Sequence, residues 1–125
     1  MSPVRFLIVG LVLAGCVAGI DETGPEYLGV RTSLLDDDLV QFEVELVGAE
    51  TAEAVETYAD CAAAQYALIR GQSFARLVRV NSGFTGGTWR ADAVYTISPD
   101  LPRGRATIDA VVKVADCRAS GVPTV

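Results

Sequence analysis

The side chains of this chain that could most readily take part in catalysis or metal binding are its carboxylates and cysteines, because the sequence contains no histidine. The absence of histidine removes Ser-His-Asp and Cys-His catalysis and most zinc sites. Asp92 and Asp109 fall on two predicted strands, where a carboxylate pair would suit glycoside hydrolysis. Each is more simply the polar alternate residue of its strand, so we expect no catalytic residue.

Three consecutive aspartates, Asp36, Asp37 and Asp38, are the strongest candidate for a metal site. Their surroundings lack the spacing and the glycine of an EF-hand calcium loop. A solvated turn is the simpler interpretation. We expect no metal site and no cofactor.

The glycine-rich segment 83–87, within a predicted loop over residues 81–87, is similar to a phosphate-binding loop only superficially, because no lysine follows it and the next element is a predicted strand. We predict a flexible hairpin loop with Phe84 at its tip, where the ring contacts a partner or membrane, or else folds back onto the core. Arg76, Arg79 and Arg90 form either a basic stripe or internal ion pairs, and pairing is the simpler alternative.

The first residues of the chain have the pattern of an export signal. Arg5 precedes an apolar run over residues 6–14, followed by small residues and Cys16. About nine apolar residues suit a signal, whereas a membrane-spanning helix needs about twenty. The alternatives are a hydrophobic helix in the core, or a plain secretory signal that leaves Cys16 unmodified.

The tetrapeptide Leu13-Ala14-Gly15-Cys16 resembles the lipobox of bacterial lipoproteins. The resemblance implies cleavage before Cys16, a diacylglycerol group on its thiol and an acylated amino terminus. We therefore predict a signal peptide over residues 1–15, a lipidated tether over 16–26 and one domain over 27–125. The membrane is then a partner through the lipid anchor, and Val17 implies transfer to the outer membrane.

If Cys16 carries lipid, Cys61 and Cys117 are the remaining cysteines, and in an exported protein they permit one disulfide. We predict this Cys61–Cys117 bond. A redox role is the competing hypothesis, which the absence of a Cys-x-x-Cys motif disfavours. Two free thiols would require a different compartment.

Charge is unevenly distributed along the chain. The net charge is −6, or −7 without Arg5, which excludes nucleic acid as a favoured partner. Residues 21–60 carry −11 and residues 61–125 carry +4. Antiparallel elements from the two halves would neutralise each other across one sheet. The alternative is a dipolar surface that docks a partner.

Hydrophobic periodicity predicts two strands, one helix and three further strands. Residues 27–34 and 40–46 alternate around the triple-aspartate turn. Residues 51–70 form an amphipathic helix that ends at Gly71. The apolar face of this helix is predicted to contain Val55, Tyr58, Ala59, Ala62, Tyr66 and Ile69.

The later strands are predicted over residues 74–80, 88–97 and 105–115. The order ββαβββ indicates an α+β domain with a mainly antiparallel sheet of about five strands and one helix on one face. Cys117 then lies just past the last strand.

Segments 58–71, 74–76, 93–95 and 114–117 resemble small bacterial envelope lipoproteins in which an alanine-rich helix precedes an aromatic-bearing strand. This resemblance implies location and fold and carries no catalytic residues. We expect a non-enzymatic accessory or interaction module at the periplasmic face of the envelope, with an envelope protein as its partner. The alternative is a small ligand-binding or hydrolytic domain that uses Asp92, Asp109 or the arginines.

Overall fold

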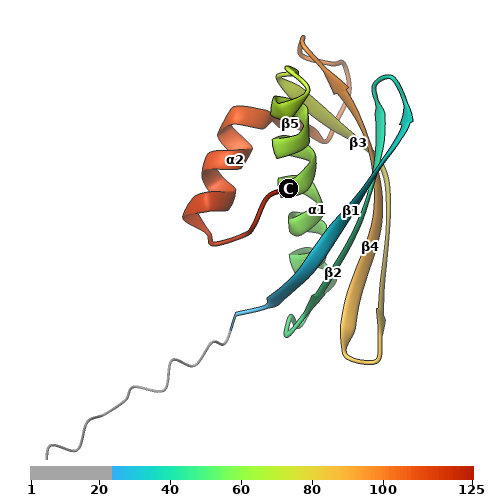
Figure 1. Ribbon diagram of the computed structural model, residues 1–125, viewed down its shortest axis with the longest axis vertical. Helices are drawn as coiled ribbons and strands as arrows, with labels where there is room; N and C mark the ends of the chain where they lie inside the picture. Colours follow the sequence, from blue (N-terminus) through green and yellow to red (C-terminus); the bar gives the residue numbers. More distant parts are fainter. Residues whose placement is uncertain (1–23) are drawn as a thin grey trace, which may run out of the picture.

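The computed structural model describes residues 24–125, which form three layers: a sheet, helix α1 against one of its faces, and helix α2 on the far side of α1 (Figure 1). Along the chain the elements are β1 (Glu26–Asp36), β2 (Leu39–Val47), α1 (Ala52–Ile69), β3 (Phe74–Thr85), β4 (Thr88–Ser98), β5 (Thr107–Asp109) and α2 (Ala110–Ala119). The five-stranded sheet has the order β1-β2-β4-β3-β5, and all neighbouring strands are antiparallel. The predicted α+β class and ββαβββ order are confirmed, and a second helix follows them.

The core lies between the sheet and α1. Alternate residues of β2 and β4 face the helix, as the period of two requires. They are Val40, Phe42, Val44 and Leu46 on β2, and Ala91, Ala93, Tyr95 and Ile97 on β4, all almost fully buried. Phe42 is at their centre, with its ring in edge contact with Tyr66 and Tyr95 at centroid distances of 5.7 Å each.

Helix α1 occupies nearly the predicted range, and Gly71 ends it as predicted. Gly71 adopts a left-handed φ of +72°, which glycine tolerates without steric cost. The Gly71 and Gln72 amides donate to the carbonyl oxygens of Leu68 and Ala67 at 3.0 and 2.8 Å. This pair of bonds is the Schellman arrangement that satisfies the last carbonyl groups of a helix.

Two sides of α1 are buried instead of the one predicted stripe. The buried residues include Cys61, Ala63, Ala64 and Ala67 in addition to most of that stripe. Ile69, which we placed on the apolar face, is 61% exposed. The second side of α1 is buried because α2 covers the side of α1 that faces away from the sheet (Figure 1).

The predicted third late strand over residues 105–115 is wrong for most of its length. Only Thr107–Asp109 is strand, and Ala110–Ala119 is helix. Asp109 is the N-cap, because its side chain accepts a hydrogen bond from the Val112 amide at 3.2 Å. Ala110, Val114 and Cys117 are the buried residues of α2, and their spacing is helical. Cys117 therefore lies within this helix.

Both predicted hairpins are present, with one difference in length. The β1–β2 turn falls at the three aspartates, as predicted. The β3–β4 loop is shorter than the predicted segment 81–87, because β3 continues to Thr85 and only Gly86 and Gly87 form the turn. Their φ angles of +60° and +80° suit the tight turn that matches strand twist.

Strand β1 forms one edge of the sheet and contains two irregularities. Leu28 and Leu35 are extra residues with no partner on β2. Between them, Gly29 to Leu34 pair regularly with β2. Such bulges bend a strand and increase its twist.

Candidate functional site

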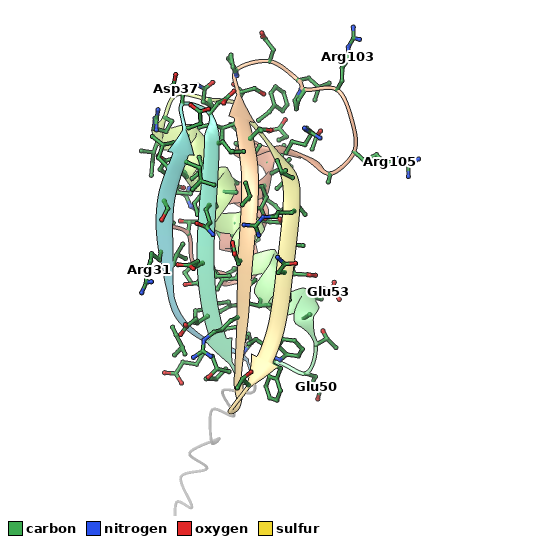
Figure 2. The ribbon with its side chains drawn as sticks, turned by 90° about the vertical axis from the view of Figure 1, so that its right-hand side faces the viewer. Arg31, Asp37, Glu50, Glu53, Arg103 and Arg105 are labelled. Carbon is green, nitrogen blue, oxygen red and sulfur yellow. A yellow bond between two sulfur atoms is a disulfide. The ribbon has the colours of Figure 1, made fainter. Side chains whose placement is uncertain are left out.

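The outer face of the sheet, opposite α1, carries an ordered array of charged side chains and is the candidate site. The residues of this face form rows across four strands, in the strand order β1, β2, β4 and β3. One row is Gly29, Glu45, Arg90 and Gly83, and the next is Arg31, Glu43, Asp92 and Asn81. Figure 2 looks onto this face, with Arg31 at its β1 edge.

Three ion pairs connect neighbouring strands on this face. Arg90 Nε lies 2.9 Å from Glu45 Oε1, Arg79 lies 3.4 Å from Asp92, and Arg31 lies 3.5 Å from Glu43. Gln41 also donates to Asp92 Oδ1 at 2.7 Å. Exposed pairs of this kind contribute about 0–1 kcal/mol each, so stability alone does not account for the array.

A shallow groove of about 650 Å³ runs over the two rows. Gly29 and Gly83 form the ends of the first row, and a Cβ added at either would meet no atom within 4 Å. The groove is therefore open above the backbone at both ends of the Glu45–Arg90 pair. An extended chain or a small polar ligand fits this shape better than an enclosed substrate does.

Asp92 and Asp109 are not a carboxylate pair. Asp92 lies opposite Asn81 of β3, and Asp109 lies opposite Phe74 of the same strand. At about 3.3 Å per residue, this places their backbones roughly 20 Å apart, well beyond the roughly 5–10 Å of glycosidase carboxylates. Asp109 caps α2 and Asp92 belongs to the ion-paired face, so the predicted carboxylate pair is not formed.

Two of the three arginines singled out in the sequence form internal ion pairs, whereas Arg76 takes part in none of the ion pairs among the described residues. Arg79 and Arg90 both contact carboxylates on neighbouring strands. Among the described residues, only the Arg90–Glu45 ion pair joins the acidic first half of the chain to the basic second half. Neutralisation between the two halves across the sheet is therefore limited to this pair.

The three aspartates lie at an exposed turn, where the Asp37 amide donates to Asp36 Oδ1 at 2.8 Å. Within residues 24–125, no three His, Cys, Asp or Glu side chains come together as metal ligands would.

The predicted disulfide is present in the structure. Cys61 of α1 and Cys117 of α2 are bonded, with their Cα atoms 6.0 Å apart. The periodicity places Cys117 just past the last strand, but Cys117 lies instead within α2, which packs against α1. The predicted signal peptide, Cys16 and most of the predicted tether lie outside the described residues, and they remain predictions.

Phe84 is exposed to solvent and also packs on a neighbouring aromatic ring. Its side chain is 56% exposed, and its ring packs on Trp89 with the centroids 5.0 Å apart. Phe84 lies opposite Trp89, one residue pair before the two-glycine turn. Trp89 is itself held in place, since its indole N–H donates to the Ala49 carbonyl at 3.0 Å.

A buried polar contact that the sequence did not predict lies between α1 and the sheet. The Tyr95 hydroxyl donates to Asp60 Oδ1, and Tyr95 is only 1% exposed. Burial raises the pKa of Asp60 above 3.8, while the Tyr95 hydrogen bond and the charge of Lys113 oppose this shift. Burial and the Asp60 charge raise the pKa of Tyr95, so the phenol keeps its proton.

The raised pKa of Asp60 makes stability depend on pH in a defined direction. The folded state holds the Asp60 proton more tightly than the unfolded chain, so this contribution is full below pH 3.8 and is lost as pH rises through the folded pKa. We expect the Asp60→Asn variant to gain stability relative to the natural chain as pH rises, because the asparagine side chain still accepts the Tyr95 hydrogen bond but carries no charge. Urea unfolding of both proteins between pH 3 and 7 measures this. A stability difference that stays constant with pH would contradict it.

The fold and its outer face define a small α+β domain with two disulfide-linked helices and an open, ion-paired sheet surface. The chain belongs to the YNQ4 C-terminal domain family, whose model matches residues 27–121. It is 31% identical over 87 residues to a protein of Paracoccus denitrificans named "Uncharacterized 26.9 kDa protein in nqo8 5'region". The match covers 70% of this chain and 34% of that protein, so the chain spans about a third of its relative's length. No solved structure matches the chain.

Within residues 24–125, neither helix has both the length and the apolar character that a membrane crossing requires.

Proposed function

We propose that this chain is a lipid-anchored protein of the periplasmic face of the envelope, whose domain acts as a non-enzymatic interaction module. The observation that carries this proposal is the outer sheet face, an open and ordered polar surface over a filled core. Its charged groups contribute little to stability, so recognition of a partner is the better explanation for their arrangement. The lipobox resemblance of residues 13–16 supports the anchor.

The match to a longer protein supports the idea of a module. In the Paracoccus relative, the matched part makes up about a third of the protein. A domain that occurs beside other segments in a longer chain folds and acts as a unit. The partner-binding surface of such a unit is an exposed face, and here it is the face that neither helix covers.

A photo-crosslinking amino acid at Arg31 tests the interaction surface in intact cells. Arg31 lines the groove, and its side chain is 81% exposed, so the substitution leaves the core intact. We expect one crosslinked envelope protein from this position and none from Arg118, an exposed residue of α2 that serves as the control.

A charge-reversal variant tests whether the crosslink depends on the ion-paired face. Arg90→Glu places a second carboxylate beside Glu45 and should reduce the crosslink, while the free energy of unfolding changes by less than about 1 kcal/mol. A crosslink that Arg90→Glu leaves unchanged would refute this surface as the binding site.

The anchor and the alternative function have separate readouts. Mass spectrometry of the mature amino terminus should find an acylated Cys16, and an unacylated product that retains residues before Cys16 would refute the anchor.

The ligand-binding alternative is favoured by the glycines at both ends of the groove. A purified chain that retains a small molecule while no protein is crosslinked would favour that alternative.

A further inference from the structure

The end of the sheet at which the described chain begins is also the end at which the β3–β4 hairpin turns. Glu26, Val47, Thr88 and Thr85 form one row across four strands. With neighbouring strands about 4.8 Å apart, Glu26 and Thr85 are roughly 14 Å from each other. Figure 1 shows the hairpin projecting at the lower end of the molecule, beside the entry of the chain.

This hairpin presents an apolar side chain on a rigid support. Phe84 is more than half exposed, although it packs on Trp89, and the Trp89 indole is bonded to the Ala49 carbonyl. The turn beyond it consists of Gly86 and Gly87, which have no side chains to keep the backbone away from a surface. An exposed aromatic ring held in this way is suited to the interface between water and lipid.

The length of chain before the domain limits how far this end can lie from the bilayer. Seven residues separate Cys16 from Gly24, and an extended chain that advances about 3.4 Å per residue covers these eight steps in at most roughly 27 Å. If Cys16 carries lipid, as the proposed function requires, the hairpin stays within reach of the membrane surface. We propose that Phe84 and the Gly86–Gly87 turn dock onto this bilayer, and that they contact zwitterionic phospholipid.

The charges at this end determine which lipid fits. Glu26, Glu50 and Glu53 lie near the start of β1 and the start of α1, and Figure 2 shows Glu50 at the lower end of the molecule. These carboxylates repel an anionic lipid surface. The docking therefore depends on apolar contact, and anionic lipid should weaken it.

The chain contains its own reporter, because Trp89 is its only tryptophan and touches Phe84. The experiment places the full, processed chain in phosphatidylcholine vesicles whose acyl chains carry bromine, which quenches indole emission at short range. We expect Trp89 emission to fall relative to vesicles without bromine. Replacing part of the lipid by phosphatidylglycerol should restore part of the emission.

Variants assign the contact to Phe84. Phe84→Ser should lower the ratio of docked to undocked domains roughly tenfold, because the half-exposed ring supplies the apolar contact. Phe84→Leu should keep most of the quenching. Leu101→Ser is the matched control, because Leu101 is 69% exposed in the segment after β4, at the opposite end of the strands.

The outcomes separate this inference from the proposed function. A chain that fails to float with the vesicles refutes the anchor. A chain that floats with unquenched Trp89 leaves the anchor intact and overturns the docking. Quenching that Phe84→Ser does not reduce, or that Leu101→Ser reduces equally, overturns the assignment to this hairpin.

Discussion

Replacing Cys61 and Cys117 by alanine should lower the free energy of unfolding by about 4 kcal/mol, because the disulfide closes a loop with a sequence separation of 56 residues. Both cysteines are almost fully buried where α2 lies against α1. Helix α2 has only ten residues and packs on the domain through three buried side chains. The covalent bond to α1 is therefore a large part of what holds this helix in place.

Urea unfolding of the double alanine variant and the natural chain measures this loss. The natural chain in reductant should show a similar loss. Amide hydrogen exchange should increase first in Ala110–Ala119, before it increases in β2 and β4. A loss below about 1 kcal/mol would show that packing alone keeps α2 against α1, and would contradict the prediction.

The second large effect is expected at Phe42, where alanine should cost about 3–5 kcal/mol. Phe42 is fully buried at the centre of β2, and its ring contacts Tyr66 of α1 and Tyr95 of β4. The substitution removes the contact that joins the helix to two strands. Alanine-rich α1 has few long side chains nearby that could fill the space.

Thermal and urea unfolding of Phe42→Ala measure the predicted loss. Phe84→Ala is the matched control, because it removes the same ring from a half-exposed position and should cost about 1 kcal/mol or less. Phe42→Leu should recover most of the stability. Equal effects at Phe42 and Phe84 would contradict this assignment of the core.

Elements whose apolar residues repeat with one clear period, as in β2 and α1, were predictable from the sequence. Helix α2, whose apolar residues fit both the strand and the helix period, was not. Residues 40–46 alternate strictly, and residues 51–70 repeat at helical spacing, so β2 and α1 lie where predicted. Residues 108–114 alternate in the same way, yet Ala110, Val114 and Cys117 also repeat at helical spacing. The Asp109 cap and Gly121, with φ of +72°, mark the helix, and they are the signals the strand prediction missed.

The candidate site depends on strand register, which the sequence does not specify. Gly83 lies opposite Arg90 because the β3–β4 turn has only two residues, and Gly29 lies opposite Glu45 only because Leu35 is an extra residue between Gly29 and the β1–β2 turn. Each such residue shifts the pairing by one position, and alternation alone does not locate it. Asp60 was missed because it lies outside the predicted apolar face of α1, although Tyr95 of β4 donates a hydrogen bond to it and the charge of Lys113 on α2 affects its pKa.

The two extra residues of β1 also limit what the edge of this sheet can join. Only the six residues from Gly29 to Leu34 keep the regular geometry that a further strand needs, and Arg31 stands among them. Two copies meeting antiparallel about this residue would bring their guanidinium groups together and repel each other. This edge of the sheet therefore disfavours edge-to-edge pairing of two copies into one continuous sheet.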